Sequence, residues 1–224
     1  MKKLLLAVLC LAVALPALAQ SKVDKRLSES TAVLSTLLTK PDGISKSLLD
    51  KAQCVLVYPG VKKVAVGIGG SYGRGVLVCR SGKGMNGKWG APIMYTLDTG
   101  SLGAQLGSTS TDYVLLVMSQ QGADKVLSGK LKLGADATAA AGPSAAQASG
   151  FNDPNVDILT YSQAKGLFTG VSLGSASMAV DNGGNKDLYG KDTDAMQIVG
   201  GNTGVPAAAK PLVELLDKTS PKHM

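Results

Sequence analysis

The apolar residues near the start of the chain have the spacing of an α-helix. Between residues 22 and 39 they recur on one helix face, while charged residues occupy the other faces. A turn signal at residues 41–43 separates this stretch from residues 44–52, which predict a second short helix. This amphipathic start either packs on the rest of the fold or lies on a membrane surface. The apolar residues of the first helix are Val23, Leu27, Leu34 and Leu38.

From Cys54 onward the pattern changes to that of short strands. Apolar or alternating runs are separated by glycine corners, and the first five have no segment between them that could form a crossover helix. Glycine makes up 28 of the 224 residues, which favours tight turns and strands over long helices. The expected strands lie within residues 54–59, 61–80, 91–99, 101–108, 111–119, 156–163 and 166–180.

Two more helices complete the expected fold. Residues 123–129 predict a brief helix, and Ala207 to Leu216 predict a C-terminal one. Residues 131–150 have the small-residue, low-complexity composition of a flexible loop. The predicted fold class is therefore α+β: a mostly antiparallel, glycine-rich sheet or partly closed barrel, with an N-terminal helical segment and a C-terminal helix.

The first nineteen residues have the organisation of a secretory signal peptide. Lys2 and Lys3 precede an apolar run at residues 4–15, and the small-residue pattern of residues 17–19 follows. The apolar run is shorter than the roughly 20 residues that a membrane-spanning helix needs. We therefore expect cleavage after Ala19 and a periplasmic or secreted protein.

Basic residues are concentrated in one part of the chain. The formal net charge is +7 at pH 7, yet the stretch from residue 51 to residue 97 contains no acidic residue at all. A block of one sign creates a local positive field that attracts anionic partners, unless the fold supplies acidic residues from elsewhere. The basic residues of this block are Lys51, Lys62, Lys63, Arg74, Arg80, Lys83 and Lys88.

The chain has few residues suited to catalysis. Its one histidine, His223, is the penultimate residue, which argues against a Ser/His/Asp triad, a Cys/His pair or a histidine-based zinc site. An enzyme would have to rely on a deep pocket that collects Asp112, Asp136 or Tyr161. We therefore expect a non-enzymatic protein.

No cofactor or metal is expected from the motifs. Residues 82–87 match the letters G-x-G-x-x-G, but a strand-like segment follows where a dinucleotide site needs a helix, so a hairpin loop is predicted. The acidic turns near Asp181 and Asp192 lack the spacing of a calcium loop. Nucleic acid is not an expected partner, because few aromatic residues accompany the basic block.

Cys54 and Cys79 are the two cysteines that remain after the expected cleavage. They lie at the edges of predicted strands, 25 positions apart, and an even count in an oxidising compartment favours a structural disulfide. The alternative is a pair of buried free thiols.

Four stretches of the sequence together resemble the SYLF domain family. They are AQCVLVYPGVKKVAVGIGGSYGRGVLV, KWGAPIMYTLDTGSLGAQLGSTSTDYVLLVM, KLGADATAAAGP and ILTYSQAKGLFTGVSL, in the family's order and followed by LYG at 188–190. The resemblance implies an α+β domain without known catalytic activity, in which residues 133–143 are an ordered element. Eukaryotic members bind phosphoinositides, and some bind or bundle actin. This chain differs from them in having an expected signal peptide and a pair of cysteines after it, and in lacking an SH3 or FYVE domain.

The resemblance and the charge pattern together give the expected organisation and function. We expect a signal peptide at 1–19, an N-terminal helical segment at 20–43, a SYLF-like domain at 44–190 and a C-terminal segment with a short helix at 191–224. The expected partner is an anionic lipid or membrane surface, and the alternative is a protein-interaction or structural module of the envelope. Trp89 lies either at that surface or in the core. The expected ligand-binding residues are Lys62, Lys63, Arg74 and Lys88, followed by Arg80 and Lys83.

Overall fold

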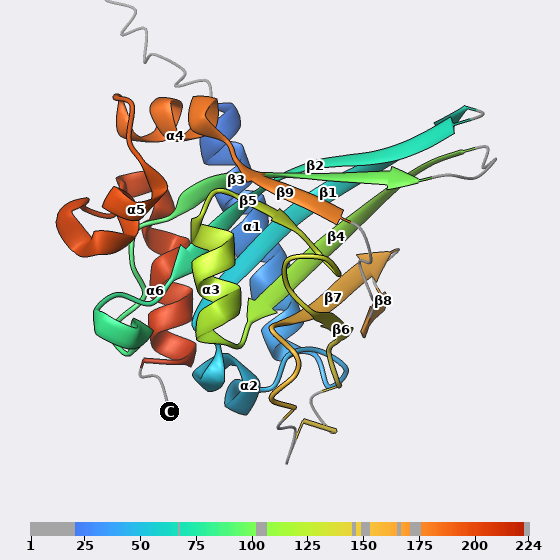
Figure 1. The fold of residues 1–224 in the computed structure, drawn as a ribbon, viewed down its shortest axis with the longest axis horizontal. Coiled ribbons are helices and arrows are strands. Elements are labelled where there is room, and N and C mark those ends of the chain that lie inside the picture. The colour runs from blue at the N-terminus through green and yellow to red at the C-terminus, as the bar shows by residue number, and fades with distance from the viewer. Residues whose placement is uncertain are drawn as a thin grey trace, which may run out of the picture.

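A strongly curled sheet organises the computed structural model, which describes residues 21–66, 68–101, 107–144, 147–148, 153–164, 167–170 and 176–221 (Figure 1). The expected signal peptide with its cleavage site after Ala19 lies outside the described residues, and so does His223. The strands are β1 (Cys54–Val66), β2 (Ile68–Cys79), β3 (Ile93–Ser101), β4 (Gly107–Val117), β5 (Lys130–Lys132), β6 (Ala139–Ala141), β7 (Ile158–Ala164), β8 (Leu167–Gly170) and β9 (Ala176–Val180).

The strand order is β5-β9-β3-β2-β1-β4-β7-β6, with β8 paired to β7. Only the β6–β7 pair is parallel among the described strands. The two ends of this order, β5 and β6, follow each other in the chain, and a bridge between Leu133 and Ala137 joins the turn between them. The short connection pulls both edges to one side and curls the sheet toward a barrel. The predicted α+β fold with a partly closed barrel is confirmed.

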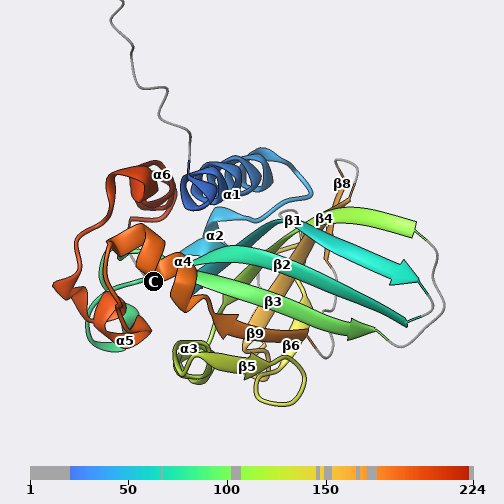
Figure 2. The same cartoon turned by 90° about the horizontal axis from the view of Figure 1, so that it is seen from above.

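Helices cover the sheet on both sides (Figure 2). The inner face carries Leu56, Leu77 and Leu115 and packs with α3, while the outer face carries Val55, Val76 and Leu116. Helices α1, α2 and α6 cover the outer face. The helices are α1 (Lys22–Thr39), α2 (Lys46–Lys51), α3 (Gln120–Leu127), α4 (Asn182–Tyr189), α5 (Ala195–Gln197) and α6 (Lys210–Thr219), with 3-10 turns at Lys83–Met85 and Ala207–Ala209 and a π turn at Ile198–Asn202.

The expected helices form with small shifts at their ends. Helix α1 begins after Ser21, whose hydroxyl accepts a hydrogen bond from Asp24 N, and buries Leu27, Leu34 and Leu37. No described helix is long and apolar enough to cross a membrane.

The stretch 131–150, which looks like a loop by composition, contributes the edge strand β6, as the family resemblance implied. Gly142, which directly follows β6, has a packing role: a Cβ added there would lie 2.1 Å from the Tyr161 ring. The Tyr161 hydroxyl donates to Pro143 O, which holds this edge of the sheet. Small residues are needed here because β6 approaches a buried aromatic ring.

Candidate functional site

A β-bulge at Pro59–Gly60 determines which lysine of β1 faces outward. The register of β1 shifts here against both neighbouring strands. Gly60 has a φ of 59°, and its N–H donates to Asp112 Oδ1 on β4 at 2.7 Å. The extra residue leaves Tyr58 and Val61 both in the inner core. Lys62 therefore points to the outer face, and Lys63 to the inner side.

Beyond the bulge, β1–β4 continue as an arm that projects past the helices (Figures 1 and 2). We use the word arm for residues 61–66 of β1, 68–74 of β2, 97–101 of β3 and 107–111 of β4. On β2, Gly70, Tyr72 and Arg74 alternate with Gly73 and Gly75, whose added Cβ atoms would clash with Val61 and Tyr58 of the inner core. The outer face of the arm thus presents Tyr72 and Arg74, while the glycines let the strands pack closely inside.

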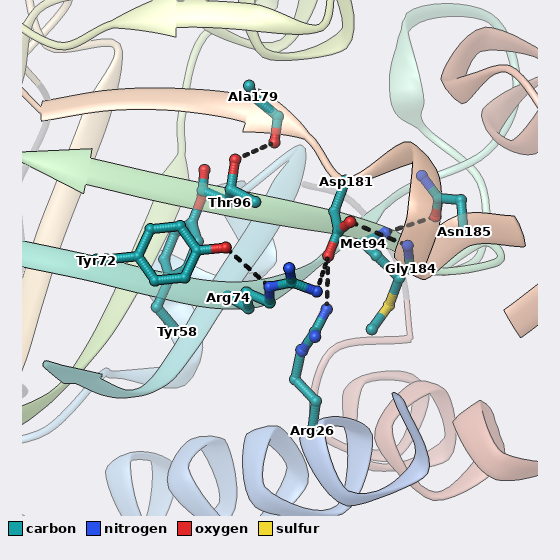
Figure 3. Close-up of polar contacts among 10 residues, drawn as sticks. All are labelled: Arg26, Tyr58, Tyr72, Arg74, Met94, Thr96, Ala179, Asp181, Gly184 and Asn185. Atoms are coloured by element: carbon teal, nitrogen blue, oxygen red, sulfur yellow. Dashed lines mark hydrogen bonds and ion pairs between the residues drawn. The ribbon is translucent and has the colours of Figure 1, made fainter. Parts of the chain in front are cut away.

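Arg74 is oriented by two groups (Figure 3). Its Nε donates to the Tyr72 hydroxyl at 2.8 Å, and its Nη1 lies 3.4 Å from Asp181 Oδ2. The Tyr72 hydrogen bond and the Asp181 charge raise the pKa of Arg74. The side chain is nevertheless 50% exposed, so the guanidinium is held in place and still reaches solvent.

Asp181 joins three parts of the chain (Figure 3). Its Oδ2 also lies 3.1 Å from Arg26 Nη1 of α1, and its Oδ1 accepts from Gly184 N at the start of α4. Arg26 and Asp181 are each 8% exposed at the side chain. The sequence DNGGNKD, expected to be a polar turn, is therefore the capped start of a helix. The carboxylate of Asp181 forms ion pairs with two arginines.

A hollow opens on the outer face of the arm beside Tyr72. It is lined by Lys62, Gly70, Ser71, Tyr72 and Asp98, and we call it the Tyr72 hollow. Tyr72 is 49% exposed, and Lys62 and Asp98 are exposed as well. In the described part of the chain, neither Lys62 nor Asp98 forms an ion pair.

The structure does not bring the expected basic residues together. Lys62 and Arg74 share the outer face of the arm, whereas Lys63 lies on the opposite side of the sheet. Lys83 and Lys88 lie in the β2–β3 connection, which follows the other end of β2 at Cys79. Their exposed side chains therefore cannot contact the same small ligand as Lys62.

Arg80 is not part of a docking surface, because its side chain is fully buried. Its Nε donates to Ala52 O at 3.1 Å and its Nη2 to Ser220 Oγ at 2.5 Å, and its guanidinium stacks 4.2 Å from the centre of the Trp89 ring. Burial lowers the pKa of Arg80, and Asp50 and Asp217 partly oppose this. The expectation that Arg80 binds a ligand is wrong, since the side chain instead ties α2 and the end of α6 to the sheet. Trp89 is 3% exposed and belongs to the core.

Cys54 and Cys79 form a disulfide, with an S–S distance of 2.09 Å. They are cross-strand partners on β1 and β2, and both are buried in the inner core. The predicted disulfide is confirmed.

The residues proposed for an alternative enzyme have structural contacts instead. Asp112 accepts from the bulge, Asp136 Oδ2 accepts from Lys132 N at 2.8 Å, and the hydroxyl of Tyr161 donates to Pro143. No group of three or more His, Cys, Asp or Glu side chains with metal-binding geometry occurs among the described residues.

Sequence reasoning missed Tyr72, Asp98 and Arg26, and it considered Asp181 only as part of an acidic turn. The signal for Tyr72 was available: in YGRG, Tyr72 and Arg74 alternate with glycines, which is typical of a strand with one crowded and one open face. Asp98, Arg26 and Asp181 lie on other elements, so only the folded chain shows that they are neighbours.

Comparison with known proteins places the chain in a family. A family model described as Ysc84, Las17-binding protein actin regulator, matches residues 98–219, which is more than half of the chain. The chain belongs to the Ysc84 family. This family corresponds to the SYLF resemblance of the sequence.

Several curated eukaryotic proteins are similar to this Ysc84-family chain. An SH3 domain-containing protein of Schizosaccharomyces pombe, PJ696.02, is 31% identical over 78% of this chain and 41% of its own length. Protein YSC84 of Saccharomyces cerevisiae is 31% identical over 66% of this chain and 32% of its own. Human SH3 domain-containing YSC84-like protein 1 is 30% identical over 67% of this chain and 44% of its own. The Ysc84-family chain thus spans less than half the length of these relatives. No solved structure matches it.

Proposed function

We propose that this protein is a non-enzymatic, exported phospholipid-binding module whose docking surface is the outer face of the arm. One observation carries the proposal: Lys62 and Arg74 flank the exposed ring of Tyr72 where the arm projects beyond the helices. Two cations suit the phosphate of a lipid headgroup, and a tyrosine is well placed at an interface that is apolar on one side and wet on the other. The membership in the Ysc84 family supports a binding role, because its description names binding and regulation.

The phosphate-binding role follows from what each cation already contacts. Arg74 uses its Nε for Tyr72 and its Nη1 for Asp181, which leaves both hydrogens of Nη2 without a described partner. Lys62 is exposed and stands directly across from Tyr72 on the neighbouring strand. A phosphate oxygen between the two strands would therefore meet a preoriented guanidinium and a flexible ammonium.

Replacing Lys62 with Gln is expected to weaken binding to vesicles that contain phosphatidylglycerol about fivefold, since one cation near an anionic leaflet contributes about 1 kcal/mol. Binding should also fall as salt rises, because exposed charges are screened. Lys63→Gln is the matched control: it removes the same charge from the next residue, which faces the other side of the sheet. Vesicle flotation of the three proteins measures the effect. Equal losses in both variants would argue for diffuse charge attraction and against a site at Tyr72.

Export is part of the proposal, and the buried disulfide supports it because disulfides persist in oxidising compartments. We expect that protein expressed from the full sequence in a secreting bacterium begins at Gln20, and that Cys54 and Cys79 resist alkylation without a reductant. Intact mass and N-terminal sequencing of the extracytoplasmic fraction measure both. A chain retaining residues 1–19 would contradict cleavage after Ala19.

A further inference from the structure

The Tyr72 hollow presents charges of both signs. Lys62, Tyr72 and Asp98 lie in one row across β1, β2 and β3, because Tyr72 pairs with Lys62 on one side and with Asp98 on the other. Neighbouring strands lie about 4.8 Å apart, so the backbones of Lys62 and Asp98 are separated by about 10 Å. A half-exposed aromatic ring stands between an exposed ammonium and an exposed carboxylate.

The charges of Lys62 and Asp98 do not take part in the ion pairs that hold the neighbouring elements together. Within the described residues, Lys62 and Asp98 make no ion pair with each other or with another side chain, unlike Arg26, Arg74 and Asp181 nearby. A purely anionic ligand would meet the repulsion of Asp98. A ligand with an anionic and a cationic centre a few ångströms apart would match both charges.

The hollow also has space for such a ligand. Gly70 precedes Tyr72 by two residues on the same face of β2, and the nearest atom to a Cβ added there would be Thr99 O at 3.7 Å. The absence of a side chain at Gly70 thus keeps the hollow open. Its volume of about 440 Å³ is in the range of small-ligand sites.

We propose that the Tyr72 hollow recognises the phosphoethanolamine headgroup of a bilayer phospholipid, with the phosphodiester at Lys62 and the primary ammonium at Asp98 and the Tyr72 ring. This inference rests on the proposed function and adds the class of headgroup to it. The ammonium donates hydrogen bonds to the carboxylate and contacts the ring face. A choline headgroup has no N–H to donate to Asp98, and a glycerol headgroup has no cation.

The test compares three kinds of vesicle: phosphatidylcholine alone, phosphatidylcholine with phosphatidylethanolamine, and phosphatidylcholine with phosphatidylglycerol. We expect the wild-type chain to bind the ethanolamine-containing vesicles about fivefold more tightly than phosphatidylcholine alone, the factor that one exposed ion pair supplies. Asp98→Asn should lose this gain while keeping, or increasing, its binding to the phosphatidylglycerol vesicles. Lys62→Gln should weaken binding to both.

A second variant fills the hollow without changing a charge. Gly70→Leu should bind the ethanolamine-containing vesicles no more tightly than phosphatidylcholine alone. An unchanged thermal unfolding curve would show that the fold is retained. An ethanolamine gain that persists in Asp98→Asn or in Gly70→Leu would overturn the headgroup assignment. So would a wild-type chain that binds the phosphatidylglycerol vesicles through Lys62 and shows no ethanolamine gain. If Lys62→Gln binds every vesicle as well as wild type does, the proposed docking surface itself is wrong.

Discussion

Replacing Asp181 with Ala is expected to lower the free energy of unfolding by about 3–5 kcal/mol, because the change leaves a buried arginine without its counter-ion. Arg26 is 8% exposed, and its described polar contact is with Asp181. The variant also removes the hydrogen bond from Gly184 N that caps α4. Urea unfolding followed by the fluorescence of Trp89, the single tryptophan, measures the loss.

A double variant separates the buried charge from the rest of this effect. Arg26→Met combined with Asp181→Ala removes both partners, and it should be more stable than Asp181→Ala alone because no unpaired charge stays buried. A double-mutant cycle gives the coupling energy of the pair. A loss below about 1 kcal/mol in Asp181→Ala would show that Arg26 finds water or another partner, contrary to its buried position.

Arg80→Ala should destabilise the protein by a similar amount, about 3–5 kcal/mol, since a buried hydrogen-bonded cation is replaced by a cavity. The variant removes the donor of Ala52 O and of Ser220 Oγ and the cation stacked on Trp89. Because these acceptors belong to α2 and to the end of α6, faster amide exchange should appear first in α6. Urea unfolding and hydrogen exchange measure the two effects.

Two variants serve as controls for Arg80. Arg80→Lys keeps the charge but cannot provide the planar, forked set of donors, so an intermediate loss is expected. Lys88→Gln, in the same connection but exposed, should change stability by no more than about 0.5 kcal/mol. If Arg80→Ala lowered the free energy of unfolding no more than Lys88→Gln does, the buried contacts of Arg80 would have no role in stability.

The sequence pattern predicted the elements whose apolar residues are periodic and missed those that depend on distant contacts. Helix α1 could be predicted because one of its faces is apolar, and the core strands because they are apolar on both faces. Helix α4 could not, because NGGNKDLY has two glycines and no apolar stripe. It forms because Asp181 caps it and because Asn185 Oδ1 accepts from Met94 N on β3.

The candidate site was predicted in part, for similar reasons. The acid-free block contains Lys62 and Arg74, which share the outer face of the arm, but it does not indicate which of its members are buried. The burial of Arg80 depends on acceptors in α2 and at Ser220, which is 140 residues away. The orientation of Lys62 depends on the bulge, and Pro59–Gly60 looks like the end of a strand until Asp112 is seen to accept from it.

The bulge also limits how this chain can change length in evolution. Each residue inserted into or deleted from β1 between Gly60 and Lys62 exchanges the two faces of everything that follows in the strand. A single-residue insertion or deletion would turn Lys62 to the inner side of the sheet, and the deletion would put Lys63 opposite Tyr72, while changes of two residues would keep Lys62 on the outer face. Relatives that keep the docking surface should therefore differ in this segment only by even numbers of residues.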